Sequence, residues 1–514
     1  FLHFKLNINI YLFRMSILFL ILQFIQIGFG QGKKCSEIDS NLCYVKEKYI
    51  ASKFAIEKRY ENQDNIYVSQ VPLLADMDGD CIPEFIIHGG SQNILIIDTK
   101  TGLTKWNIAT PNFNRFNNAI AIADIDDNGI AEIFVDVAAD FQNPFNLDGR
   151  LICYRVDGSI LGISDEKVDL NSINAMGGTP ALADFNQDGI PEIYLSNKIF
   201  NARTGVKLAD GGANGIGTQL KPGYRAKPLT IAAQLDDDSN DLELAAGYTV
   251  YKIKINNPNG MAGNSMTPHN IQVDNGYKDG FTSVADINLD GRLDIVVTSP
   301  GISNVALLYV YNLLPNGTTK LIAKTHPSGN NDAIGAPFVG DIKSSGSPSI
   351  LLSRVTKLHS YSYNGTGILQ QDWVLNTTDS SGFTGLTMFD FNNDGKQEIV
   401  YRDETTLSII DGSSLLPTRI GMIDCYSRTE FEYPIVGDFD NSGQAKICVP
   451  CAFEFFVDLG KLTVFSAPDS LPGWTPARSV WNQYNYHVLN INDDLTVPRV
   501  QKNNQNRYNS SAKW

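Results

Sequence analysis

Cysteine is scarce in this chain, which has seven cysteines in 514 residues. So few cysteines exclude a small scaffold held together by disulfides. The pairing of Cys35 with Cys43, and of Cys425 with Cys448 or Cys451, is nevertheless compatible with a few bridges. Cys448 and Cys451 form a CxxC motif without a second CxxC or a histidine pair, so a zinc site is not expected there.

Catalytic motifs are absent as well. The chain has six histidines, none with the spacing of metal ligands, and it contains no HExxH, GxSxG, P-loop or helix-opening GxGxxG pattern. We therefore expect a protein that is not an enzyme and nominate no catalytic residue. We expect the isolated histidines to be surface or core residues and not catalytic ones. They are His88, His269, His326, His359 and His487.

Positive charge is also in short supply. The 41 basic residues are outnumbered by 56 acidic ones, and the formal net charge is -15. A nucleic-acid backbone is therefore a poor partner, whereas cations are good ones. The 43 glycines and 43% hydrophobic residues suit many short strands joined by tight turns.

Long apolar runs are limited to the N-terminal region. The stretch over residues 15–30 has the length and the small-residue ending of a secretory signal peptide. It is too short, and too interrupted by Gln23 and Gln26, to predict a membrane span. We expect export of a mature chain that starts near Gln31; a buried N-terminal helix is the alternative.

A repeated acidic pattern dominates the rest of the chain. Five segments read D-x-[DN]-x-[DN]-x-x-x-[DE] and start at Asp76, Asp124, Asp184, Asp286 and Asp390. Three eroded copies start at Gln234, Asp341 and Asp438. Successive copies lie 48 to 60 residues apart, a spacing typical of propeller and solenoid repeats. We call these segments the first to eighth acidic loops in chain order.

The sequences around the acidic loops predict strands. Each loop lies between short apolar runs such as TPALAD and EIYLSN, and further strand-like runs follow in most units. Three or four strands in about 50 residues form one antiparallel sheet, and such sheets arranged radially form a β-propeller. We expect an all-β fold with eight four-stranded blades, or seven if one terminal unit is only part of a blade.

The domain boundaries follow from this pattern. We place the propeller at residues 66–470, after an N-terminal segment over 31–65, and a C-terminal extension at 471–514. The N-terminal segment is the natural donor of a closing strand for the last blade, although the periodicity of residues 46–60 also fits a short helix.

The five complete loops are predicted to bind calcium, at about five sites. Alternate positions carry oxygen ligands that a tight loop turns onto one ion, and hard oxygen donors suit Ca²⁺. Strands in place of helices, and an acid at position nine, exclude an EF-hand. The predicted ligands are Asp76, Asp78, Asp80 and Glu84; Asp124, Asp126, Asn128 and Glu132; Asp184, Asn186, Asp188 and Glu192; Asp286, Asn288, Asp290 and Asp294; and Asp390, Asn392, Asp394 and Glu398.

Some loops depart from the pattern. Cys81 replaces the glycine of the first loop, which should weaken that site unless Gly79 relieves the turn. The sixth loop keeps only Asp341 among its acids and is expected to bind nothing. In the eighth loop Lys446 replaces the final acid, and we expect its ammonium to fold back onto Asp438 and Asp440.

These loops, with the apolar strands that precede them, resemble the FG-GAP/VCBS repeats of integrin α-subunits and of many large secreted bacterial surface proteins. The resemblance covers roughly residues 66 to 465, with Ile334-Gly335-Ala336-Pro337 nearest to the Gly-Ala-Pro signature. It implies a calcium-stabilised propeller used outside the cell, at the cell surface or in secreted form, for adhesion or for binding a protein or glycan.

The C-terminal extension is rich in aromatic and asparagine residues. It resembles a segment that follows such propellers and precedes further modules, so we expect a truncated reading frame with further C-terminal modules. Its aromatic side chains are predicted to pack against the propeller rim or to form a sugar-stacking face. The residues concerned are Trp474, Trp481, Tyr484, Tyr486 and His487. Two other functions stay open: a polysaccharide lyase or hydrolase on a propeller scaffold, and a structural subunit of an extracellular fibre.

Overall fold

The computed structural model describes residues 54–110, 120–136, 149–168, 175–176, 179–216, 218–221, 224–226, 229–269, 279–299, 305–328, 333–455 and 457–501. Within these ranges the chain forms 36 β-strands and no α-helix. No helix with the length and apolar character of a membrane span occurs in them. The predicted signal peptide over 15–30 lies outside the described residues.

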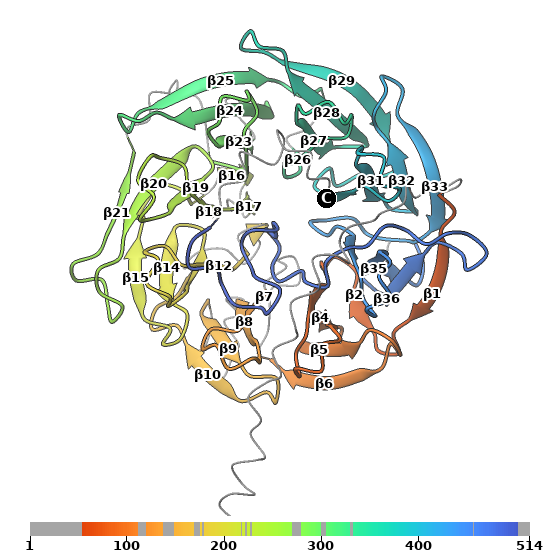
Figure 1. The fold of residues 1–514 in the computed structure, drawn as a ribbon, viewed down its shortest axis with the longest axis horizontal. Helices are drawn as coiled ribbons and strands as arrows, with labels where there is room; N and C mark the ends of the chain where they lie inside the picture. Colours follow the sequence, from red (N-terminus) through yellow and green to blue (C-terminus); the bar gives the residue numbers. More distant parts are fainter. Residues whose placement is uncertain are drawn as a thin grey trace, which may run out of the picture.

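The strands form a ring of antiparallel sheets around a central axis (Figure 1). Six of the sheets have four strands, and one has nine. The nine-stranded sheet contains two four-stranded blades joined through β2 (Ile66–Tyr67), which pairs with a strand of each. Counted in this way, eight four-stranded blades surround the axis, and the prediction of an all-β propeller is confirmed.

Each blade runs from an innermost strand near the axis to an outermost strand at the rim (Figure 1). In this order the first four blades are β3 (Leu73–Ala75), β4 (Glu84–Gly89), β5 (Asn93–Asp98) and β6 (Thr104–Ala109); β7 (Ile120–Ala123), β8 (Glu132–Asp136), β9 (Leu151–Tyr154) and β10 (Ile160–Ile163); β12 (Ala181–Ala183), β13 (Glu192–Leu195), β14 (Lys198–Asn201) and β15 (Lys207–Asp210); β18 (Ile231–Ala233), β19 (Glu243–Ala246), β20 (Thr249–Lys254) and β21 (Ser265–Pro268).

The other four blades follow the same order. They are β22 (Phe281–Ala285), β23 (Asp294–Ser299), β24 (Leu307–Leu313) and β25 (Thr319–Thr325); β26 (Phe338–Gly340), β27 (Ser349–Arg354), β28 (Lys357–Tyr363) and β29 (Leu369–Asn376); β30 (Leu386–Phe389), β31 (Glu398–Arg402), β32 (Thr406–Asp411) and β33 (Thr418–Asp424); and β34 (Ile435–Gly437), β35 (Lys446–Ala452), β36 (Leu459–Ser466) and β1 (Glu57–Glu61). A small sheet of β11 (Ala175–Met176), β16 (Thr218–Lys221) and β17 (Tyr224–Ala226) belongs to no blade and was not predicted.

The last blade takes its outermost strand from the beginning of the propeller. β1 pairs antiparallel with β36, from Glu57 opposite Ser466 to Glu61 opposite Thr463. The N-terminal segment thus contributes a strand, and not a helix, at these residues. This pairing joins the start of the propeller to its end and closes the ring.

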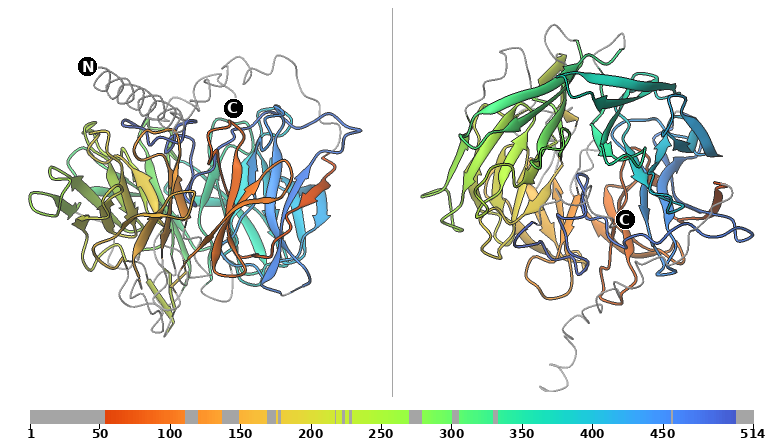
Figure 2. Two further views of the ribbon diagram at one scale, coloured as in Figure 1. Left: turned by 90° about the horizontal axis from the view of Figure 1, so that it is seen from below. Right: turned by 45° about the horizontal axis from the view of Figure 1, so that its top comes forward.

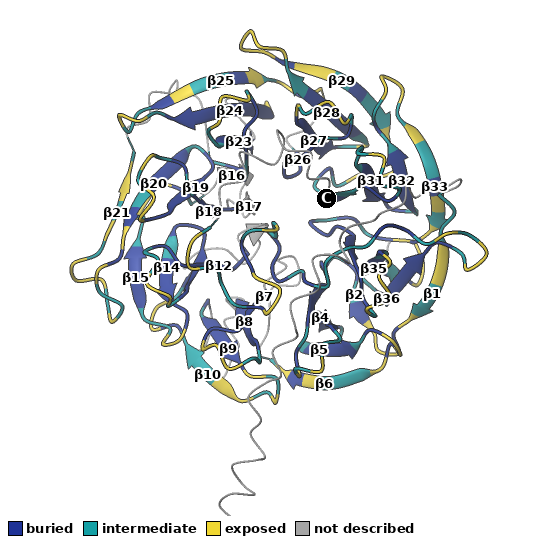
Figure 3. Ribbon diagram, in the orientation of Figure 1, coloured by how far each residue is buried: buried dark blue, intermediate teal, exposed yellow. Residues whose placement is uncertain are grey.

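Burial explains why the blade strands have continuous apolar sequences. All six residues of β4 and all six of β27 are buried, because neighbouring blades cover both faces of these strands. The outermost strands face solvent on one side, so β33 mixes buried and exposed positions (Figure 3). The core is therefore a series of apolar layers between blades.

The segment after β36 crosses one face of the ring and packs at the axis (Figure 2). Leu74 on β3 and Trp481 exchange backbone hydrogen bonds of 2.9 and 2.7 Å, and Ile122 on β7 donates to Asn482. The ring of Tyr484 lies 5.0 Å from that of Tyr433. Trp481 therefore lies against the innermost strand β3 near the axis and not at the rim, where it was predicted. Trp474 packs instead against Phe391 in the seventh acidic loop, with ring centroids 4.8 Å apart.

One disulfide links the last two blades. It joins Cys425, which follows β33, to Cys451 on β35. Cys448, the other member of the CxxC motif, is buried and free. Cys81 also belongs to a disulfide. The Cys425–Cys451 bridge agrees with the expectation for that group of cysteines, whereas a bridge at Cys81 was not predicted. Cys35 and Cys43, which were expected to pair, lie outside the described residues.

Candidate metal-binding loops

The eight acidic loops occupy equivalent positions in the eight blades. Each connects the innermost strand to the second strand, as between β7 and β8 or between β30 and β31. The last acid of each complete loop is the first residue of the second strand, and it pairs with the last residue of the innermost strand, for example Glu132 with Ala123. The loops therefore lie at the same end of the innermost strands all around the axis.

The second loop shows how the backbone holds the acids. Asp124 accepts hydrogen bonds from the backbone nitrogens of Asn128 (3.1 Å) and Gly129 (2.7 Å), while Glu132 accepts from that of Ile125 (3.2 Å). The turn needs a positive φ at Asp127 (57°) and at Gly129 (86°), and glycine adopts this conformation without steric cost. The glycine at the same loop position also has a positive φ in the third, fifth and seventh loops, at Gly189, Gly291 and Gly395.

The third, fifth and seventh loops repeat this arrangement. Their first acids accept backbone hydrogen bonds at 2.8 to 3.1 Å from the fifth and sixth residues of the loop. Their ninth acids accept from the second residue at 2.9 to 3.0 Å. The residues that form these contacts are Asp184 and Glu192, Asp286 and Asp294, and Asp390 and Glu398.

In the second, third, fifth and seventh loops the first and ninth ligand positions are buried and the other two are more exposed, whereas in the first loop Asp76 is half-buried and only Glu84 is buried. In the second loop Asp124 and Glu132 are buried, whereas Asp126 and Asn128 are exposed. Burial disfavours the charged form of a carboxyl group. It raises the pKa of Glu132 to about 7, and that of Asp294 and Glu398 to about 8. A bound cation would relieve this cost by favouring the ionised carboxylates.

The predicted ligands come close enough together to share an ion in two of these loops. In the first loop, oxygens of Asp76, Asp78 and Glu84 lie within 4.8 Å of one another, and in the second those of Asp124, Asp126 and Glu132 do. The other three complete loops have asparagine at position three, and its amide nitrogen donates to the acid at position five. These contacts are Asn186 to Asp188 (3.0 Å), Asn288 to Asp290 (3.0 Å) and Asn392 to Asp394 (3.3 Å).

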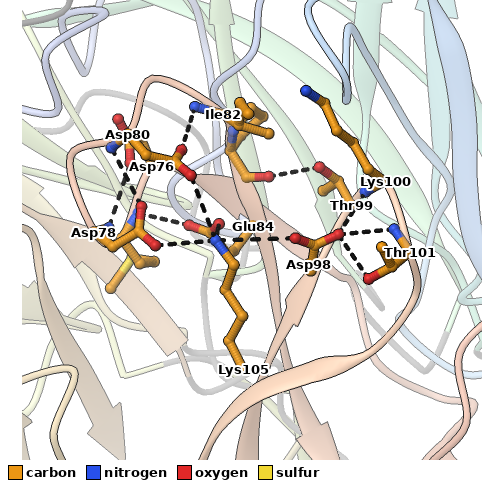
Figure 4. Close-up of polar contacts among 12 residues, drawn as sticks. Asp76, Asp78, Asp80, Ile82, Glu84, Asp98, Thr99, Lys100, Thr101 and Lys105 are labelled. Atoms are coloured by element: carbon orange, nitrogen blue, oxygen red, sulfur yellow. Dashed lines mark hydrogen bonds and ion pairs between the residues drawn. The ribbon is translucent and has the colours of Figure 1, made fainter.

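The first loop differs because a lysine meets its acids (Figure 4). The Lys105 ammonium, on β6, lies 2.6 Å from Glu84, 2.9 Å from Asp78 and 3.7 Å from Asp80. Gly79 and Cys81 both have positive φ, at 74° and 71°. The neighbouring glycine therefore takes one of the two left-handed positions, and Cys81 itself takes the other.

The eighth loop also contains a lysine. The Lys446 ammonium lies 2.6 Å from Asp440 and 2.8 Å from the hydroxyl of Ser442. The expected fold-back onto Asp440 is therefore present. The sixth loop keeps the same backbone with few acids, since Asp341 accepts from the backbone nitrogens of Ser345 (3.0 Å) and Gly346 (2.7 Å). The loop conformation thus does not require a full set of ligands.

Comparison with known proteins supports this architecture. No family model matches the chain, and no curated protein matches it. Among solved structures, the chain is similar to the Vibrio cholerae biofilm matrix protein Bap1, with 16% identity, coverage of 88% of this chain and 97% of that one, and a TM-score of 0.59. It is also similar to the quinohemoprotein alcohol dehydrogenase ADHIIG of Pseudomonas putida HK5, with 10% identity, coverage of 82% and 78%, and a TM-score of 0.51.

This chain has a propeller fold. The two similar proteins are named for different functions, so the likeness concerns fold alone. The resemblance to FG-GAP/VCBS repeats stays a prediction based on the acidic loops, because no family model supports it.

A cluster of two acids and a histidine lies at the fourth loop and was not predicted from the sequence. One ligand atom from each of Asp236, Glu243 and His269 lies within 4.8 Å of the others. His269 is 26 positions beyond Glu243, so no local spacing signals the cluster. Two of the other histidines, His88 and His359, are fully buried, as expected for core residues.

Proposed function

We propose that this protein is an extracellular β-propeller that binds calcium through its acidic loops and serves as a binding or adhesion module for a protein or glycan. The observation that carries the proposal is the equivalent placement of the acidic loops in all blades. Four of them, the second, third, fifth and seventh, keep a complete set of oxygen ligands with no ion pair to a lysine or arginine in the described residues. Calcium is the ion that this donor set suits best.

Calcium has a structural role in this proposal. Each loop joins two strands of one blade, so an ion held by its acids stabilises the inner part of that blade. If free calcium exceeds the dissociation constant tenfold, each site contributes about 1.4 kcal/mol, and four sites contribute about 6 kcal/mol. This is comparable to the whole stability of many domains. The first loop is a fifth site only if calcium displaces Lys105 from Glu84 and Asp78.

An extracellular location agrees with two features. The Cys425–Cys451 disulfide needs an oxidising compartment, and millimolar calcium outside the cell would keep weak sites occupied. Bap1, which shares the fold at low identity, is described as a biofilm matrix protein. A role in binding or adhesion is in keeping with these features and with the absence of catalytic motifs from the sequence.

A glycan array probed with and without calcium tests the binding role. We expect calcium-dependent binding to a limited set of glycans, or to a protein partner recovered by cross-linking at the cell surface.

A second assay tests the enzymatic alternative. Acidic polysaccharides are incubated with the protein and assayed for new reducing ends and unsaturated uronates. Turnover in that assay would replace the binding role by the enzymatic alternative, and regular filaments in electron micrographs would favour the fibre subunit.

A further inference from the structure

We propose that Asp236, Glu243 and His269 in the fourth blade form a site for a divalent transition-metal ion such as Zn²⁺, distinct from the calcium loops. This goes beyond the proposed function, because the fourth loop lacks the calcium pattern. Its first position is Gln234 in place of aspartate, and the loop is one residue longer than the complete ones. Glu243 still pairs with Ala233, as Glu132 pairs with Ala123.

A hairpin brings His269 to this loop. β20 and β21 pair so that Tyr251 lies opposite Pro268, and the backbone nitrogen of His269 donates to the carbonyl of Val250 at 2.9 Å. The imidazole therefore follows directly after the outermost strand and reaches the loop at the inner end of β19. There one of its ring nitrogens lies within 4.8 Å of the carboxylate oxygens of Asp236 and Glu243.

Two buried polar atoms in this cluster lack partners. Glu243 is 0% exposed, and its Oε2 accepts the backbone nitrogens of Leu235 (2.9 Å) and Asp236 (3.1 Å), whereas its Oε1 has no hydrogen bond. The Nε2 atom of His269 is likewise buried without a partner. Buried polar groups are nearly always satisfied, so an unpartnered oxygen and nitrogen in one cluster point to a ligand between them.

The orientation of the imidazole fits metal binding. The ring of His269 forms a hydrogen bond with the backbone of Gly317, which leaves Nε2 as the unpartnered nitrogen. Histidine ligands usually use one ring nitrogen for the metal and the other for a backbone or carboxylate partner. Gly317 lies in the turn after β24, so a neighbouring blade fixes the ring.

The donor set selects the kind of ion. Calcium and magnesium prefer oxygen donors alone, whereas one imidazole with two carboxylates suits zinc and related first-row ions. Three protein ligands also leave a position for water on zinc. Lys252 competes for the same acid, since its ammonium lies 3.3 Å from Asp236 and 3.7 Å from Asp238. An ion bound here would have to displace this ammonium from Asp236.

The test uses the untagged, full-length protein in saturating calcium, titrated with Zn²⁺ in a calorimeter and with Co²⁺ in a visible spectrometer. We expect one zinc equivalent that excess calcium does not displace, and a Co²⁺ spectrum of low-symmetry coordination. His269→Gln should weaken this binding at least tenfold, while Lys252→Met should tighten it. His326→Gln, at an exposed histidine on the outer side of the fifth blade, is the matched control and should behave as the parent protein.

The calcium stoichiometry and the melting temperature in calcium are measured for each variant. An unchanged calcium count with a lost zinc equivalent in His269→Gln would support the site independently of the calcium proposal. Zinc binding that persists in His269→Gln, or that excess calcium abolishes in the parent protein, would overturn it. A His269→Gln protein that no longer folds would be replaced by His269→Asn, which is judged by the same zinc and calcium counts.

Discussion

The first and second acidic loops have nearly the same backbone, yet they differ in what faces their acids. In the first loop the Lys105 ammonium reaches Glu84 and Asp78 from the rim strand β6. In the second loop Asp124, Asp126 and Glu132 form no ion pair within the described residues. The same contrast separates the eighth loop, with Lys446, from the third, fifth and seventh loops.

The two kinds of loop balance the negative charge of their acids in different ways. A lysine neutralises part of the charge permanently and independently of the surroundings, whereas an open cluster depends on a dissolved ion. Because the sixth loop keeps the turn with only one acid, the backbone conformation itself needs neither. The acids therefore set how far the stability of a blade responds to calcium.

Removal of calcium should have the largest effect, because it reaches all open loops at once. We expect chelation to lower stability by about 6 kcal/mol and to lower the melting temperature markedly. Differential scanning calorimetry with excess EDTA, with metal removal checked by elemental analysis, measures this. An unchanged melt after complete removal would contradict the calcium role.

The same experiment has a pH dependence. Burial raises the folded-state pKa of Glu132 to about 7 and of Asp294 and Glu398 to about 8. In the calcium-free protein these groups favour folding while protonated, so this stability is present below about pH 4 and is lost as the pH rises toward 8. The difference between calcium-bound and calcium-free melts should therefore be larger at pH 8 than at pH 5.5. A larger difference at pH 5.5 would show that these carboxyls are not the calcium ligands.

Replacement of Lys105 should have the next largest effect. Lys105→Met leaves the fully buried Glu84 without its cation and should cost about 1 to 3 kcal/mol in calcium-free buffer. Calcium should restore the loss and bind with one additional equivalent, because the first loop then becomes open. Urea unfolding with and without calcium and a calorimetric calcium count measure both effects. Lys100→Met, at an exposed lysine after β5, is the matched control and should change neither.

The opposite substitution in the eighth loop should have a smaller effect. Lys446→Glu gives this loop the acid that the complete loops have at position nine, beside Asp438 and Asp440. We expect one additional calcium and about 1.4 kcal/mol of extra stability when calcium is tenfold above its dissociation constant. Calcium titration of the variant, with Lys320→Glu on the outer strand β25 as the control, tests this. An unchanged count would mean that position nine does not decide calcium binding.

The smallest effect is expected from an ion pair between two loops. Arg292 in the fifth loop lies 2.7 Å from Asp237 in the fourth, but the Asp237 side chain is 62% exposed. Exposed pairs contribute little, so Asp237→Ala should change stability by less than about 1 kcal/mol and leave the calcium count unchanged. A larger loss in a thermal melt would show that neighbouring loops act together.

Much of the fold could be predicted because its signals are local and repeated. The first aspartate and the glycine five residues later recur in most loops, so the number of loops gave the number of blades, and the apolar runs on either side gave their inner strands. The N-terminal closing strand followed from the requirement that a ring be complete. β1 is indeed found beside β36.

The features that could not be predicted from the sequence depend on contacts between distant segments. Lys105 and Lys252 reach the acidic loops from other strands of their blades, and His269 does so at the end of a hairpin. Spacing in the sequence does not tell which face of a blade, or which end of a strand, such a side chain will reach. The same holds for Trp481, whose partner Leu74 is about 400 residues earlier in the chain.

The antiparallel pairing of β1 and β36 has a mechanical consequence. Glu57 lies opposite Ser466, so the chain enters β1 beside the point where it leaves β36. Tension that pulls these two points apart would unzip the pairing one hydrogen bond at a time instead of shearing all of them together. The segment around Trp481 and Asn482 forms hydrogen bonds with two separate innermost strands, β3 and β7. These contacts would still connect the blades if the pairing of β1 with β36 were broken.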